Sequence, residues 1–87
     1  MLKLYLFLKG YRKIPFTYIE RHNSIHYPFR YSVTVFESDR ELDYAFEDNE
    51  DTPLMLSKIS KEENVKAICV HDHKNKYHYY KELKRWR

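Results

Sequence analysis

Two stretches of the chain alternate side chains with a period of two, as in a β-strand whose successive residues face opposite sides of a sheet. The first is LKLYLFLK, residues 2–9, and the second is YPFRYSVTVFE, residues 27–37. A third stretch, VKAICVHD at residues 65–72, is more continuously apolar and predicts a central, largely buried strand. Because strands must pair, these three stretches predict a sheet.

Two further segments complete the predicted N-terminal half. Residues 14–19 (IPFTYI) form a weaker strand candidate, because Pro15 cannot donate to a ladder and suits an edge strand. Residues 20–26 (ERHNSIH) are most simply a loop.

The middle of the sequence predicts helices. Ser38 followed by Glu41 has the pattern of a capping box, and Leu42, Ala45 and Phe46 follow at helical spacing. A strand in which Leu42, Tyr44 and Phe46 share one face is the rival interpretation.

A second helix is predicted after DNEDTP. Thr52 would be its N-cap and Pro53 its first helical residue. Met55, Leu56 and Ile59 then share one apolar face.

The C-terminal segment contains a predicted turn, HKNK at residues 73–76. If this turn pairs Asp72 with Tyr77, then His71 lies opposite His78. The residues that follow, YHYYKEL, either return as a strand or begin a helix with Tyr79, Leu83 and Trp86 on one face.

A length of 87 residues is that of one domain, so residues 1–87 are expected to form a single compact unit. The predicted fold is α+β: a small, mostly antiparallel sheet of four to five strands with one or two helices packed on one face.

Cysteine use and hydropathy bear on location. Cys69 is the only cysteine, so no internal disulfide is possible, and its apolar neighbours predict burial as a small hydrophobe. The apolar run near the N-terminus is too short for a signal peptide, and no stretch approaches the roughly 20 apolar residues of a membrane span. A cytoplasmic protein without a membrane partner is expected.

Charge is strongly segregated along the chain. Residues 1–36 carry a net charge of +5, residues 37–63 carry −7, and residues 64–87 carry +5. This segregation predicts separate charged surfaces and suggests separate partners.

The basic C-terminal segment interleaves cations with aromatic rings, a combination typical of surfaces that bind single-stranded nucleic acid. Arg12, Lys13 and Arg21 are predicted to extend this surface. The candidate nucleic-acid-binding residues are Lys74, Lys76, Tyr77, Tyr79, Lys81, Lys84, Arg85, Trp86 and Arg87. The plain alternative is that the rings belong to the core and the cations only solubilise a chain end.

The acidic segment, residues 37–51, has eight Asp or Glu among fifteen residues. A solvated face is the simplest explanation. A row of carboxylates with aromatic anchors can also imitate a phosphate backbone and dock on a basic groove. The candidate residues for such a protein partner are Glu37, Asp39, Glu41, Asp43, Tyr44, Glu47, Asp48, Glu50 and Asp51.

Three histidines, His71, His73 and His78, suggest a third class of site: a metal-dependent hydrolase or a small RNase. The sequence supplies no supporting cysteine or carboxylate motif beside them, so no metal or cofactor is expected.

The function predicted from the sequence is therefore non-catalytic: a binding or regulatory protein that occupies a macromolecular surface. Nucleic acid or a nucleoprotein is the first choice of partner, an inhibitor that mimics nucleic acid is the alternative, and a homodimer is possible. The abundance of Lys and Tyr and the scarcity of Gly and Ala suggest a viral or mobile-element accessory protein.

Overall fold

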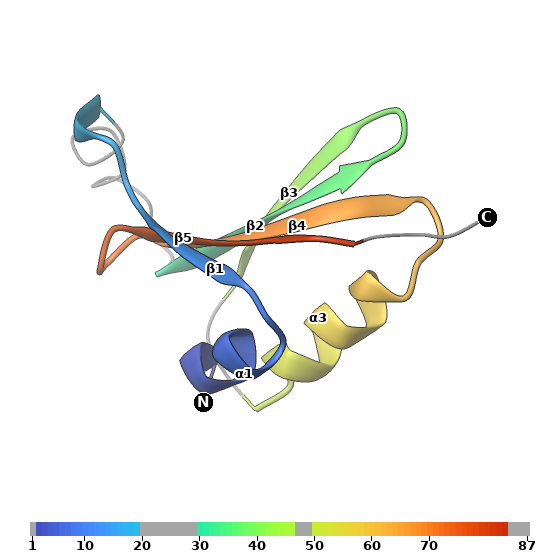
Figure 1. Ribbon diagram of the computed structural model, residues 1–87, viewed down its shortest axis with the longest axis horizontal. Helices are drawn as coiled ribbons and strands as arrows, with labels where there is room; N and C mark the ends of the chain where they lie inside the picture. Colours follow the sequence, from blue (N-terminus) through green and yellow to red (C-terminus); the bar gives the residue numbers. More distant parts are fainter. Residues whose placement is uncertain (1, 20–29, 47–49, 84–87) are drawn as a thin grey trace.

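The computed structural model describes residues 2–19, 30–46 and 50–83. A five-stranded antiparallel sheet with strand order β1-β5-β4-β2-β3 carries both helices, α1 and α3, on the same side (Figure 1). The elements are α1 (Leu2–Leu8), β1 (Arg12–Pro15), β2 (Tyr31–Glu37), β3 (Glu41–Phe46), α3 (Thr52–Ser60), β4 (Val65–Asp72) and β5 (Tyr77–Glu82). The predicted α+β class, with an antiparallel sheet and helices on one face, is confirmed.

The core lies between the sheet and the helices. Ile68 and Val70 of β4 are completely buried, and their register partners on β2, Val35 and Val33, are buried beside them. Leu56 of α3 closes the core from the helical side. The apolar run at residues 65–72 is therefore a central strand, as predicted.

The predicted strand at residues 2–9 is wrong, because Leu2–Leu8 is α1. Leu2 and Leu6, four residues apart, are buried on one helical face, whereas Leu4 and Leu8 are 48% and 69% exposed. Burial of each of the two core leucines stabilises the fold by about 1.5–3 kcal/mol. A leucine at every second position is compatible with either element over so short a segment.

Gly10 terminates α1 in a Schellman motif. The Tyr11 N–H donates to the Leu6 carbonyl at 3.0 Å, and the Gly10 N–H donates to the Phe7 carbonyl at 3.2 Å. Gly10 has φ of 82°, a left-handed conformation that glycine adopts without strain. This glycine was the sequence signal for a helix end.

The predicted helix after Ser38 is also wrong, and the rival strand interpretation is correct. Glu41–Phe46 is β3, paired with β2 so that Leu42 faces Val35 and Phe46 faces Tyr31. The Phe46 and Tyr31 rings stack with 5.6 Å between their centres. These contacts outweigh the local capping pattern.

Ser38 belongs instead to the β2–β3 turn. Its N–H donates to the Asn64 carbonyl, and the turn is closed by a hydrogen bond from the Glu37 N–H to the Arg40 carbonyl.

The second predicted helix is confirmed as α3, with its cap displaced by one residue. Asp51 occupies the N-cap position, although its side chain does not cap the helix by a hydrogen bond, and Thr52 is helical and buried. Leu56 packs into the core, with Met55 and Ile59 partly buried against it.

The C-terminal hairpin has the predicted register, with Asp72 opposite Tyr77 and His71 opposite His78. Residues 77–82 form a strand, so the helical alternative is wrong over that range; Trp86 lies outside the described residues. Asp72, completely buried, organises the turn by accepting hydrogen bonds from the Lys74 and Asn75 N–H groups and from the Asn75 side chain.

At the N-terminal side of the sheet, β1 spans Arg12–Pro15, somewhat before the predicted segment 14–19. It is an edge strand that ends at Pro15, where the missing N–H costs no ladder bond. The predicted loop at residues 20–26 and the first residues of the predicted strand at 27–37 lie outside the described residues. Within the described ranges, no helix has the length and apolarity to cross a bilayer.

Candidate functional site

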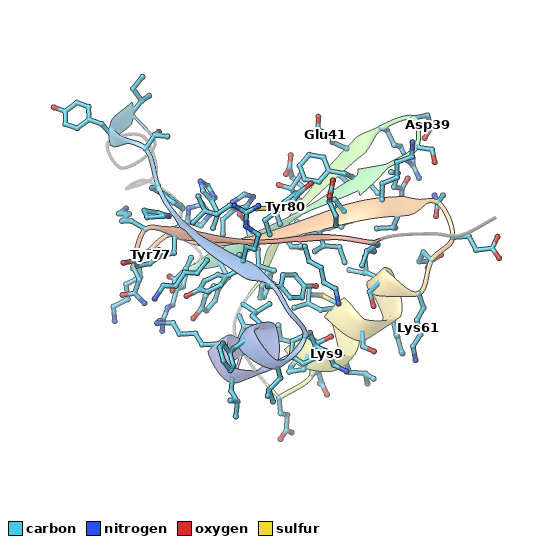
Figure 2. The ribbon with its side chains drawn as sticks, in the orientation of Figure 1. Lys9, Asp39, Glu41, Lys61, Tyr77 and Tyr80 are labelled. Atoms are coloured by element: carbon cyan, nitrogen blue, oxygen red, sulfur yellow. The ribbon has the colours of Figure 1, made fainter. Side chains whose placement is uncertain are left out.

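The strand order separates the charged segments of the chain. β1, from the first basic segment, pairs with β5, from the second, so both basic segments meet at one edge of the sheet. β3, from the acidic segment, forms the opposite edge. In Figure 2, Asp39 and Glu41 lie at the β2–β3 end of the molecule, and Tyr77 lies at the far end beside the β4–β5 turn.

On the helical face of this β1–β5 edge, lysine ammonium groups lie over aromatic rings. The Lys13 ammonium is 4.2 Å from the centre of the Tyr77 ring, and that of Lys81 is 5.7 Å from the Tyr11 ring. Such cation–π contacts hold the charges beside the rings. We call this surface, together with the adjoining β4–β5 turn that carries Lys74 and Lys76, the basic edge. Its other described residues are Lys3, Phe7, Tyr11, Lys13, Tyr77 and Lys81.

A hollow of about 210 Å³ lies within the basic edge, between α1 and the sheet. Lys3 and Lys13 contribute cations to its lining, and Phe7, Tyr11 and Tyr79 contribute rings. The Phe7 side chain is 79% exposed, so its ring face is open to a ligand. The hollow thus offers positive charge and an aromatic face at the same place.

The predicted nucleic-acid-binding residues fall into three groups. Lys74 is exposed in the turn, and Lys76, Tyr77 and Lys81 are half-buried on β5 and its approach. Tyr79 is only 6% exposed and is part of the core, so its ring stabilises the fold. The last four predicted residues, Lys84, Arg85, Trp86 and Arg87, lie outside the described part of the chain.

The predicted acidic surface is carried by a strand and its turn. Asp39, Glu41, Asp43 and Tyr44 are exposed, and Glu37 is half-buried and bound to Arg40, with its carboxylate oxygen 2.7 Å from the Arg40 Nε. Contact with that carboxylate raises the pKa of Arg40. Glu50 and Asp51 are exposed just before α3, and Glu47 and Asp48 lie outside the described residues. A groove of about 690 Å³ separates β3 from α3 and is lined by Leu42, Phe46, Met55 and Ile59 among others.

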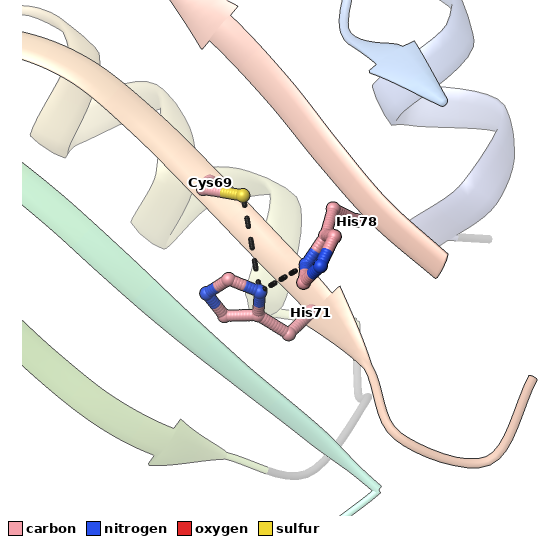
Figure 3. Close-up of side chains that lie close together, drawn as sticks. All are labelled: Cys69, His71 and His78. Carbon is pink, nitrogen blue, oxygen red and sulfur yellow. Dashed lines mark hydrogen bonds between the residues drawn. The ribbon is translucent and has the colours of Figure 1, made fainter. Parts of the chain in front are cut away.

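The face of the sheet opposite the helices carries a compact group of metal-ligand side chains (Figure 3). His71 and His78 meet across the β4–β5 pair, with their Nδ1 atoms 2.7 Å apart. The Cys69 Sγ lies 3.8 Å from the His71 Nδ1. We call these three residues the Cys-His-His cluster.

Cys69 was missed as a member of this cluster. It is 8% exposed, as its apolar neighbours predicted, but it lies on the open face of the sheet, two residues before His71 on β4. The Cys-x-His spacing on a strand was the signal, because residues two apart share a face. The sequence argument that no cysteine supports these histidines is therefore corrected.

His73, the third predicted histidine, is held slightly apart. Its Nε2 lies 2.8 Å from the Ser32 hydroxyl, and its ring is 6.2 Å from that of His71 between centres. Burial lowers the pKa of His73, and the nearby Lys76 charge lowers it further, against the opposing effect of Asp72. His73 therefore stays neutral at physiological pH.

Two residues that the sequence did not connect with His71, Thr34 and Asp43, lie near it on β2 and β3. Thr34 on β2 has its Oγ1 2.8 Å from the His71 Nε2. The same hydroxyl donates to the Asp43 carboxylate of β3 at 2.6 Å. Thr34 and Asp43 are direct register partners, so this chain of contacts follows from strand pairing.

Comparisons of the chain with protein-family models, with curated proteins and with solved structures returned no match.

Proposed function

We propose that the protein binds single-stranded nucleic acid, or a nucleoprotein, through the basic edge. The observation that carries this proposal is the pairing of β1 with β5, which brings together the lysines and rings of two segments distant in sequence. Lysine charges neutralise phosphates with release of counterions, and exposed rings stack on bases.

The lining of the hollow between α1 and the sheet favours single-stranded nucleic acid as the ligand. Lys3 and Lys13 line it together with Phe7, whose ring is largely exposed. Base stacking on such a ring contributes about 1–3 kcal/mol. The acidic β3 at the opposite edge repels the same ligand, so a nucleic acid is oriented on the protein by charge as well as by contact.

The test is a pair of triple variants with equal changes in net charge. Lys13, Lys74 and Lys81 become alanine in the first, whereas the exposed lysines Lys58, Lys61 and Lys66 become alanine in the second. Binding of a short labelled single-stranded oligonucleotide is measured by fluorescence anisotropy at several salt concentrations.

The first variant is expected to bind about tenfold or more weakly, and its plot of log Kd against log salt should be shallower by about 2, at roughly 0.7 per lost phosphate contact. The second should bind nearly as the unmodified chain does. Phe7→Ala should weaken binding by about 1–3 kcal/mol with little change in the salt slope. Equal losses in the two triple variants would mean that only net charge matters, and would refute the proposed site.

A further inference from the structure

The Cys-His-His cluster brings three potential metal ligands together on the open face of the sheet. Cys69 and His71 project from one face of β4, and His78 projects from the same face of β5 directly opposite His71. Their ligand atoms, one sulfur and two nitrogens, all lie within 4.8 Å of one another. Three ligand atoms around one point are the arrangement of a metal site built on paired strands.

The contacts of Thr34 fix the protonation of the His71 ring. The Thr34 hydroxyl donates its single proton to the Asp43 carboxylate. The Thr34 oxygen must then accept from His71, which places the ring proton on Nε2. In the neutral ring, Nδ1 is consequently a lone pair directed toward Cys69 and His78.

This arrangement is the one that protein metal sites use around a histidine ligand. A ligating imidazole usually donates its other N–H to an oxygen acceptor, which sets the tautomer and the ring orientation. Here Thr34 is that acceptor and Asp43 polarises it. These two residues lie on β2 and β3, so all five residues involved are held by regular strand pairing.

Aromatic packing shields the cluster on one side. The Phe16 ring stacks on His78 with 4.3 Å between centres and 23° between planes. Phe16 is 6% exposed, so the His78 ring is held in place by a buried neighbour. A shielded position strengthens the attraction between a cation and its thiolate ligand.

We propose that Cys69, His71 and His78 bind one transition-metal ion, Zn²⁺ above all, with a fourth coordination position left for an external ligand. One thiolate and two imidazoles are a ligand set that Zn²⁺ uses, with bonds of about 2.3 Å to sulfur and about 2.0–2.1 Å to nitrogen. In a tetrahedral site with these bond lengths, the sulfur lies about 3.6 Å from each nitrogen, and the two nitrogens lie about 3.3 Å apart. The 3.8 Å separation of Cys69 and His71 fits, and the two histidine nitrogens must move apart by roughly half an ångström from 2.7 Å.

The proton balance of binding is simple. His71 presents the lone pair of its Nδ1. The His78 Nδ1 faces that lone pair and therefore carries a proton, which moves to Nε2 when the metal binds. The Cys69 thiol loses its proton to solvent. One proton is released for each metal ion bound, and no oxidation or reduction is involved.

The test uses the full chain, chelator-treated and kept reduced with a reagent that is not a thiol, and titrated with Co²⁺. One Co²⁺ per chain is expected, with a thiolate-to-cobalt charge-transfer absorption that disappears when one equivalent of Zn²⁺ is added. Cys69→Ser should abolish this absorption. Thr34→Val should weaken binding by about 10–100-fold, because the orienting contact to His71 is lost.

His73→Gln is the matched control, since it removes a neighbouring histidine that lies outside the cluster and should leave the absorption unchanged. Circular dichroism verifies that each variant is folded. Absence of the charge-transfer absorption in the folded, unmodified chain overturns the proposal without reference to any variant. So does a Zn²⁺ affinity that is the same in Cys69→Ser as in the unmodified chain.

Discussion

The buried carboxylate of Asp72 stabilises the β4–β5 hairpin through several contacts. Both of its oxygens accept hydrogen bonds from the turn that follows. Lys3 and Arg30 place cations 3.8 and 3.7 Å from the same carboxylate. The turn sequence HKNK lacks the Asn-Gly or Asp-Gly pair that short hairpins favour. Instead, hydrogen bonds to Asp72, at the end of β4, stabilise this turn.

Asp72→Ala is expected to lower the free energy of unfolding by about 2–4 kcal/mol, because the turn N–H groups lose their acceptor and two cations lose their buried counter-charge. Asp39→Ala, at an exposed position in the β2–β3 turn, should change it by less than about 0.5 kcal/mol. Urea denaturation of both variants measures the difference, and similar values for the two would contradict the role given to Asp72.

At the scale of elements, two segments adopt the structure that their local pattern argued against. Residues 2–8 alternate as a strand would and form a helix, whereas residues 41–46 follow a capping box and form a strand. In both cases the deciding contacts lie outside the segment itself: α1 lies against α3, and β3 pairs with the neighbouring strand β2. Patterns of six or seven residues fit both periods, so local spacing alone did not decide between them.

Gly10 gives a test of how α1 ends. An alanine Cβ at this position would meet no atom within 4 Å, so Gly10→Ala changes only the backbone preference. At φ of 82° the substitution should cost about 1 kcal/mol of unfolding free energy. Lys9→Ala, on the exposed last turn before it, is the control and should be nearly neutral. A Gly10→Ala protein as stable as the control in chemical denaturation would rule out the strained Schellman position.

At the scale of the whole molecule, buried tyrosines link stability to alkaline pH. Burial raises the pKa of Tyr11 well above its ordinary value of 10.0, and burial likewise raises the pKa values of Tyr5 and Tyr79. The raised values favour the neutral rings in the folded state. The stability they contribute is fully present below pH 10.0 and is lost as pH rises through the folded-state values.

We therefore expect the free energy of unfolding to fall above about pH 10, with Tyr11 alone contributing a slope of about 1.4 kcal/mol per pH unit. In Tyr11→Phe this part of the slope should vanish. Denaturation series between neutral pH and alkaline pH, run on both proteins, measure the two slopes. If Tyr11→Phe keeps the full alkaline slope, groups other than Tyr11 cause the loss of stability.

The sequence by itself determined the class of fold, the central strand at residues 65–72 and α3. These follow from a continuous apolar run and from a Thr-Pro start before a spaced apolar face. For the last hairpin the sequence indicated the register that a tight turn would produce, but it left open whether residues 77–83 were strand or helix. It also predicted that charge would separate onto different surfaces, and the sheet order does place basic and acidic strands at opposite edges.

Only the tertiary structure decided which segments became neighbours, and the candidate sites depend on that. Lys13 reaches Tyr77 because β1 pairs with β5, and Thr34 reaches His71 because β2 pairs with β4. Cys69 lies beside the histidines because its side chain projects from the face of β4 that the helices do not cover. The physical reason is that strand pairing and core burial stabilise contacts between residues far apart in the chain, whereas a sequence pattern records only near neighbours.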